Sequence, residues 1–368
     1  MRRRWLKGLG MVLALSLLAA ACGDDDDDDA STDETSDEGG EAASDFTAGQ
    51  VTDTGGVDDR SFNQTAYAGL QEAAEEVGFE PQVLESESEA DFAPNIQTLI
   101  EQDNDLIITV GFLLGDATAA AAEENPDQNF AIVDYDYSVD AGDSADEFDN
   151  VRELTFSTDQ AAFLAGYVAA ATTETGTVGT YGGINIPTVT IFMDGFSSGV
   201  DYWNEENDGD VEVIGWDAEA QDGLFTGDFE NQAAGRSTTE QLLDDGADIV
   251  MPVAGPVGLG SVEAVEASGS DAKLIWVDTD GCVTVEESCD LFLTSVMKNM
   301  DVAVRDTTEA AAEGDFEGGL YTGTLENDGV GIAPFHEFDE SVPQEVKDAV
   351  DDLTQQIIDG DIETRPGG

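Results

Sequence analysis

From Asp45 onward, short runs rich in Val, Ile and Phe alternate with segments whose apolar residues have helical spacing. Several runs, such as 106–110, are apolar throughout, so helices must cover both faces of the sheet that they form. This alternation predicts an α/β fold with parallel sheets. Strands are expected at 49–52, 81–84, 106–110, 130–134, 151–156, 177–181, 211–215, 249–253, 274–278 and 291–295. Helices are expected at 63–77, 93–102, 116–124, 159–173, 187–204, 231–244, 257–267 and 302–313.

The chain begins with a cationic segment followed by a short apolar one. Four Lys and Arg residues lie within the first seven positions, and an uncharged, mostly apolar run then ends at Cys22. Such a run is too short for a permanent membrane helix, which needs roughly 20 apolar residues, and it is typical of an export signal. The small residues before Cys22 resemble a bacterial lipobox, although Ala19 stands where Leu is usual. We expect a signal peptide at 1–21 and a lipidated Cys22, in preference to a buried N-terminal helix.

Residues 22–45 form an acidic stretch with almost nothing apolar to bury, including an unbroken Asp run at 24–29. Like charges keep such a segment extended and solvated. It is therefore interpreted as a tether rather than as an acidic recognition tail. Together with Cys22, it predicts a lipid-anchored protein on the extracytoplasmic face of the cell membrane.

Acidic residues greatly outnumber basic ones. The chain has 82 Asp and Glu against 12 Lys and Arg, a net charge of −70 at pH 7. Such a surface repels phosphate backbones, which excludes a nucleic-acid partner. Adaptation to salt or selection for solubility explains the acidity better than an acidic binding function does. About 320 residues follow the tether, enough for two domains at roughly 150 residues each.

The cysteines divide into one lipidation site and one pair. If Cys22 carries lipid, Cys282 and Cys289 remain in a compartment that permits disulfides. A bridge between them is favoured over a metal site, because the sequence has no further thiol and its only histidine, His336, is distant. No metal and no cofactor are expected.

The residues that follow the expected strands form the candidate site, because ligands of parallel sheets bind off the carboxyl ends of the strands. These residues are 53–63, Gly111 and Phe112, Asp134, Gly182 and Gly183, Ala254 and Gly255, 278–280, and Met297 and Lys298.

In these segments the sequence resembles the basic membrane protein family of substrate-binding lipoproteins, which includes purine nucleoside receptors. The resemblance extends over about 52–299 and rests on short motifs in the same order. The motifs are the Ser-Phe-Asn turn in 53–63, Val110-Gly-Phe112, Phe163-Leu-Ala-Gly166 with Gly182-Gly183, Gly195-Phe-x-x-Gly199, Pro252-Val-Ala-Gly255, Val277-Asp-Thr-Asp280 and Ser295-Val-Met-Lys298. The resemblance implies a type I periplasmic-binding-protein fold, with two doubly wound parallel-sheet lobes and a hinge that the chain crosses three times.

For the lobes we expect 46–156 plus about 283–313 in the N-terminal one and 157–282 plus about 314–368 in the C-terminal one. Closure of such lobes traps a solute between them. The implied function is that of a monomeric binding protein, not an enzyme, which captures a nucleoside for the permease of an ABC importer. Another small solute such as a sugar, or a sensor without a transporter, remains an alternative.

Two phenylalanines are candidates for stacking on a purine. Phe62 follows a Gly-Gly turn, directly after Ser61, the expected cap of the first helix. Phe229 lies in a polar loop and corresponds by resemblance to a second cleft aromatic. It is preferred over Phe225 because its six-residue step to Gly235 fits the family spacing. Two rings from opposite lobes would sandwich a base, whereas in the alternative each ring packs in a core.

Two carboxylates and one lysine are the candidates for polar contacts. Asp134 and Asp278 end apolar strands, and carboxylates accept hydrogen bonds from ring N–H groups or ribose hydroxyls. Lys298 would bond a ribose oxygen or hold Asp278. The alternatives are solvated surface acids and a surface lysine paired with them. The predicted site is completed by Asp53, Asn63 and Gly255.

One motif suggests an enzyme instead. Gly195-Phe-Ser-Ser-Gly199 fits the nucleophile elbow of serine hydrolases, and Ser197, Asp278 and His336 follow in the order of such a triad. An elbow needs a strand directly before the serine, but 187–204 is expected to form one helix. The hydrolase is therefore the weaker hypothesis.

Overall fold

The computed structural model describes residues 45–139 and 148–365. The expected signal peptide, the lipidation site Cys22 and all but the last residue of the expected tether lie outside these ranges. Within them, no helix combines the length and the apolar character that crossing a membrane requires.

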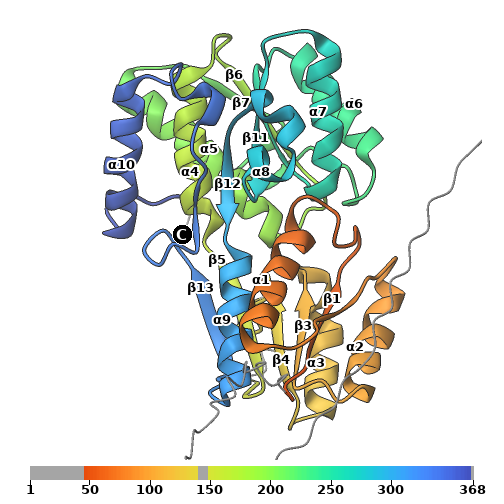
Figure 1. Ribbon diagram of the computed structural model, residues 1–368. Helices are drawn as coiled ribbons and strands as arrows, with labels where there is room; N and C mark the ends of the chain where they lie inside the picture. The colour runs from red at the N-terminus through yellow and green to blue at the C-terminus, as the bar shows by residue number, and fades with distance from the viewer. Residues whose placement is uncertain (1–44, 140–147, 366–368) are drawn as a thin grey trace, which may run out of the picture. The chain divides into compact units, whose positions relative to one another are not determined.

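The described residues of the first lobe form a six-stranded parallel sheet with helices on both of its faces (Figure 1). Across this sheet the strands are β2 (Gln82–Leu84), β1 (Ala48–Thr52), β3 (Leu106–Val110), β4 (Asn129–Val133), β5 (Val151–Phe156) and β13 (Gly319–Gly323). Helices α1 (Phe62–Val77) and α9 (Met300–Glu313) cover one face, and α2 (Phe92–Glu101) and α3 (Gly115–Glu124) cover the other. Because β1 and β3 are buried at every residue, apolar side chains occupy both of their faces.

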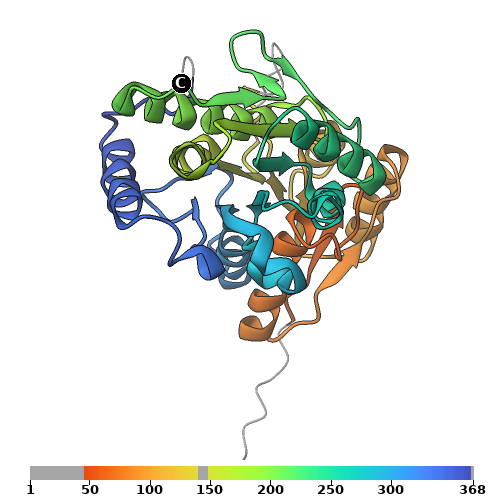
Figure 2. The same cartoon turned by 90° about the horizontal axis from the view of Figure 1, so that it is seen from above.

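The second lobe repeats this plan. Its strands are β7 (Glu212–Ile214), β6 (Thr177–Gly182), β10 (Ile249–Val253), β11 (Lys273–Asp278), β12 (Phe292–Lys298) and the antiparallel β14 (Val330–Ile332). One face carries α4 (Thr158–Thr172) and α5 (Pro187–Asn207), and the other carries α6 (Gln232–Asp244) and α7 (Gly258–Ser268). Helix α10 (Gln344–Ile358) packs beside α4 (Figures 1 and 2). Smaller elements are β8 (Trp216–Asp217), β9 (Asp222–Gly223) and α8 (Gly281–Thr284).

The strand order confirms the expected architecture of two doubly wound lobes but moves the crossings between them. The chain changes sheets after β5, after β12 and after β13. The sheets therefore place β12 (292–298) in the second lobe and β13 (319–323) in the first, whereas the expected boundaries put about 283–313 in the first lobe and about 314–368 in the second. The reason is that β12 pairs with its sequence neighbour β11, whereas β13 pairs with β5, which lies far back along the chain.

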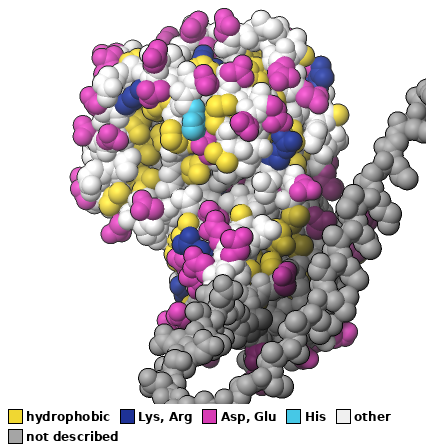
Figure 3. All heavy atoms as spheres, in the orientation of Figure 1, with side chains coloured by type: hydrophobic (Ala, Val, Ile, Leu, Met, Phe, Trp, Pro, Cys, Tyr) yellow, Lys and Arg dark blue, Asp and Glu magenta, His cyan; other side chains and the backbone are white. Residues whose placement is uncertain are grey.

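The acidity of the chain is a surface property. Figure 3 shows Asp and Glu side chains spread over the visible face, with only a few Lys and Arg among them. Most of the described cations are already paired with acids, for example Arg236 with Glu240 and Lys347 with Asp339. Repulsion between like charges thus acts mainly on the outside of the molecule.

Glycines explain the close packing of α4 against α5. A Cβ on Gly166 would overlap the carbonyl oxygen of Phe196, and a Cβ on Gly199 would overlap that of Phe163. Gly195 likewise faces the backbone of α4 at Asp159. The Gly195-Phe-x-x-Gly199 motif therefore brings two helix backbones together, because any larger residue would push them apart.

Replacing Gly199 with alanine should lower the free energy of unfolding by about 2–3 kcal/mol, because the added methyl group must displace the α4 backbone. Gly331→Ala is the matched control, since a Cβ there meets nothing within 4 Å. It should change stability by less than about 0.5 kcal/mol. Urea unfolding measures both, and equal effects of the two substitutions would contradict this packing role.

Candidate functional site

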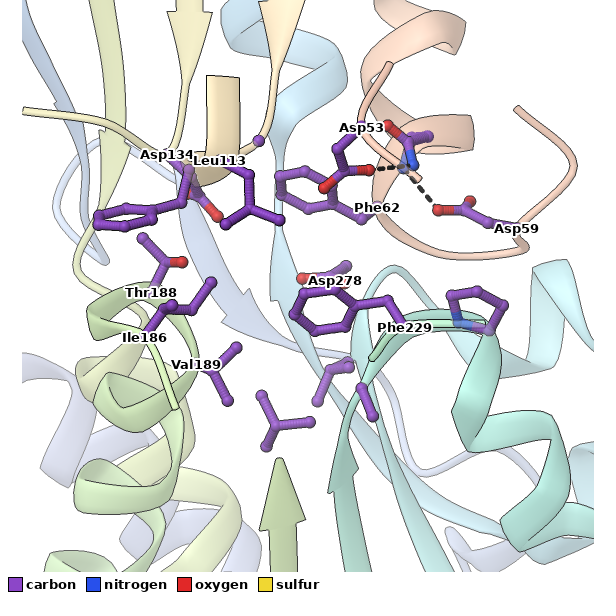
Figure 4. Close-up of a pocket in the computed structure, with 18 of the residues that line it drawn as sticks. Asp53, Asp59, Phe62, Leu113, Asp134, Ile186, Thr188, Val189, Phe229 and Asp278 are labelled. Carbon is purple, nitrogen blue, oxygen red and sulfur yellow. Dashed lines mark hydrogen bonds between the residues drawn. The ribbon is translucent and has the colours of Figure 1, made fainter. Parts of the chain in front are cut away.

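The carboxyl ends of strands from both sheets surround one cavity between the lobes (Figure 4). Its empty volume is about 580 Å³, including the space at its opening. The structure brings all eight residues predicted from the sequence to this cavity. They are Asp53, Phe62, Asn63, Asp134, Phe229, Gly255, Asp278 and Lys298.

Lys298 connects the two lobes electrostatically. Its Nζ lies 2.6 Å from Asp134 Oδ2 in the first lobe and 3.9 Å from Asp278 Oδ1 in the second. It is the one buried Lys or Arg in the described part of the chain. The rings of Phe62 and Phe192 approach the same Nζ, with centroids at 5.1 and 5.2 Å. The ring of Phe156 lies slightly farther away, at 5.8 Å. Two carboxylates and three aromatic faces thus compensate for the water that this ammonium group loses on burial.

Asp134 and Asp278 occupy equivalent places in the two lobes. Asp134 follows β4, and Asp278 ends β11, the strand at the corresponding position of the second sheet. Both have positive φ angles, 68° and 70°. This left-handed conformation costs a non-glycine residue about 1–3 kcal/mol and persists where the surroundings enforce it, often at functional sites. Burial raises the pKa of Asp278, and the charge of Lys298 opposes the rise.

Asp53 and Asn63 form a second polar pair in the first lobe. Asn63 Nδ2 donates a hydrogen bond of 2.8 Å to Asp53 Oδ1, and the Oδ1 atom of Asn63 is buried without a hydrogen-bond partner. Burial raises the pKa of Asp53 to about 8, although the hydrogen bond from Asn63 acts in the opposite direction and lowers it. At neutral pH Asp53 is therefore mostly protonated, so that it offers both a donor and an acceptor. Gly111, next to it, has a φ of 119° and leaves room for the Asp53 carboxyl group.

Asp59 lies in the candidate segment 53–63 but received no role from the sequence, and it holds the start of α1. Its carboxylate accepts hydrogen bonds from the backbone N–H groups of Ser61, Asn63 and Gln64. Burial raises the pKa of Asp59 to about 6, and these three bonds oppose the rise. The expectation that Ser61 caps the helix is wrong in one respect: its side chain makes no capping bond. The Ser61 hydroxyl instead donates across the lobes to Asp278 Oδ2, at 2.7 Å.

Two aromatic rings reach the cavity from opposite lobes. Phe62 is the first residue of α1 and Phe229 lies in the loop before α6, and both rings point into the cavity in Figure 4. Gly183 leaves space for the ring of Phe229, which a Cβ at position 183 would overlap. Phe225 does not line the cavity and packs edge-on against Trp216, with ring centroids 6.0 Å apart.

An apolar wall, which the sequence argument also misses, closes the cavity between these groups. It consists of Leu113, Ile186, Val189, Phe192 and Pro256. Three of these residues come from α5 or the residue before it, so they follow a strand end only at a distance. Phe112 also lines the cavity. Because it belongs to the Val110-Gly-Phe112 motif, it is the one signal in the sequence for apolar residues at this place.

Cys282 and Cys289 form a disulfide. The Nε2 atom of His336 lies 2.7 Å from Asp280 Oδ2, and the sulfur of Cys282 is nearby. A sulfur committed to a disulfide is not a thiolate ligand. Only the imidazole and the carboxylate remain as donors, fewer than a zinc site needs.

Ser197 lies in the middle of α5, and its hydroxyl is buried without a hydrogen-bond partner. His336, the proposed base of the triad, pairs with Asp280 rather than with Asp278. The geometry thus lacks both the strand-to-helix turn and the base that a serine nucleophile requires.

Asp53→Asn should stabilise the fold increasingly as the pH rises from about 4 to about 8. In this interval the folded chain keeps the Asp53 proton, whereas the unfolded chain, with a pKa near 3.9, has released it. Asp53 therefore lowers the free energy of unfolding of the wild type increasingly as the pH rises. Asparagine, which does not titrate, removes this loss. Urea unfolding between pH 5 and 9 measures the difference. Asp58→Asn, at an exposed position, is the control, and a pH-independent gain in Asp53→Asn would contradict the assignment.

Comparisons with known proteins agree with this geometry. The family model described as "ABC transporter substrate-binding protein PnrA-like" matches residues 46–364. The chain is 34% identical to the CD4+ T-cell-stimulating antigen of Listeria monocytogenes, over 95% of this chain and 96% of that protein. It is 32% identical to the ABC transporter nucleoside-binding protein BmpA of Lactococcus lactis subsp. cremoris, over 89% and 92% of the two chains.

Among solved structures, an ABC transporter solute-binding protein from Aeropyrum pernix K1 superimposes with a TM-score of 0.76 at 26% identity. The match covers 88% of this chain and 94% of that one. The chain therefore belongs to the PnrA-like family of ABC transporter substrate-binding proteins, which are binding proteins and not enzymes.

Proposed function

We propose that the chain is a lipid-anchored, extracytoplasmic binding protein that captures a nucleoside, preferably a purine nucleoside, for an ABC importer. The observation that carries this proposal is the pair of rings, Phe62 and Phe229, which enter one cavity from opposite lobes. A flat base between them gains about 1–3 kcal/mol from stacking on each ring. The name of the Lactococcus relative points to the same class of ligand.

The polar groups suit the rest of a nucleoside. Asp134 is assigned to the base, and Asp278 and Lys298 are assigned to the hydroxyl groups of the ribose. The protonated Asp53 and the free acceptor of Asn63 add hydrogen bonds at the base edge.

Backbone groups complete the proposed contacts. Gly255 has a φ of 53° and no side chain, so the backbone of the turn after β10 comes close to the ligand. The adjoining apolar wall excludes water, which strengthens the polar contacts in the cavity.

The sequence and the family support the proposed membrane attachment and delivery. Lipidated Cys22 and the acidic tether would hold a monomeric domain beside the membrane. Closure of the lobes around a solute would then present it to the permease.

Calorimetry with inosine, guanosine and adenosine tests the nucleoside assignment. The wild type should bind at least one of them, and Phe62→Leu and Phe229→Leu should each weaken binding by about 1–3 kcal/mol, roughly 5- to 150-fold. Asp278→Ala should abolish detectable binding, because it removes a buried acceptor that also faces Lys298.

Phe225→Leu is the matched control, since this ring belongs to the same loop region but does not line the cavity. It should leave the affinity unchanged. If the wild type binds no nucleoside but binds a sugar or another small solute, the nucleoside assignment fails while membership in the family stands.

A further inference from the structure

The loop before α1 is attached to the opposite lobe at three points. The indole Nε1 of Trp276 donates to the carbonyl oxygen of Arg60 at 3.4 Å, and the Ser61 hydroxyl donates to Asp278. The third contact is an ion pair in which Arg60 Nη1 lies 2.5 Å from Glu287 Oε1. Arg60 and Glu287 do not line the cavity, so this ion pair lies outside the site described above.

The backbone of Arg60 shows that this turn is held by its surroundings. Its φ of 58° is in the left-handed region, which arginine adopts only at a cost of about 1–3 kcal/mol. Arg60 is also separated from the stacking residue Phe62 by Ser61 alone. Contacts that hold Arg60 therefore also set the position of the Phe62 ring over the cavity.

Glu287 is presented by a braced segment of the second lobe. It lies in a short 3₁₀ segment, Glu286–Leu291, which packs against α7, α8 and β12. The Cys282–Cys289 disulfide closes the loop that contains it. This cross-link limits the conformations of the loop. The position of the Glu287 carboxylate is therefore restricted.

We propose that Arg60 and Glu287 form a latch that keeps the lobes closed over a bound solute and so determines how fast the solute leaves. The proposal rests on the capture function proposed above. The two side chains are 40% and 64% exposed, and ion pairs between exposed side chains contribute little because water and salt screen them. A latch of this strength opens readily, yet it changes a release rate measurably. Since the ion pair forms only when the lobes meet, it acts on dissociation rather than on association.

Stopped-flow measurements of inosine release test the latch in the full chain. Arg60→Gln and Glu287→Gln should each speed dissociation by up to about fivefold, with association unchanged. The charge swap Arg60→Glu with Glu287→Arg should restore the slower release. Glu286→Gln, which removes the same charge from the neighbouring exposed residue, should release inosine like the wild type.

Hydrogen–deuterium exchange without any solute separates this proposal from the proposed function. Backbone amides of 54–64 should exchange faster in Glu287→Gln than in Glu286→Gln, whatever solute the protein binds. If the wild type does not bind inosine, the nucleoside assignment fails and exchange alone decides the latch. The latch is overturned if Glu287→Gln behaves like Glu286→Gln, if the charge swap restores nothing, or if association and dissociation change equally.

Discussion

The ion pair between Lys298 and Asp134 is the contact on which the cleft depends. It joins two lobes that share no sheet, and it lies among the side chains that line the cavity. Removing one partner of a buried pair leaves an uncompensated charge, at a cost of about 3–5 kcal/mol. Because Lys298 and Asp134 belong to different lobes, the energy of their ion pair depends on how closely the lobes approach. Opening the cleft therefore weakens this ion pair.

Protonation of Asp53 and the charge of Lys298 neutralise only part of the negative charge of the four carboxyl groups in the cleft. The raised pKa of Asp53 keeps this carboxyl group mostly protonated at neutral pH. Asp59 is held by three backbone N–H groups, and Asp134 and Asp278 share Lys298. An uncharged solute with a flat, apolar face and polar edges fits such a lining better than an anion does, which is the physical reason for favouring a nucleoside.

The sequence located eight of the residues that line the cavity, because parallel strands all end at the same edge of a sheet, so that motifs after strand ends converge. Sheet membership was harder to predict. β13 is a short, half-exposed edge strand that pairs with β5, and nothing local shows this. The partners Arg60 and Glu287 are 227 residues apart, and Ser61 bonds Asp278 across the lobes. Such contacts follow from the assembled fold, which a reading of local pattern does not contain. The ligand roles of the eight residues stay predictions.

The proposed function requires the cavity between the lobes to hold a nucleoside. The decisive measurement is native mass spectrometry of the full chain, purified gently so that it retains any bound solute, followed by release and fragmentation of that solute. We expect a stoichiometric adduct whose released molecule fragments into a purine base and a ribose. A released sugar, amino acid or other solute without a base would contradict it.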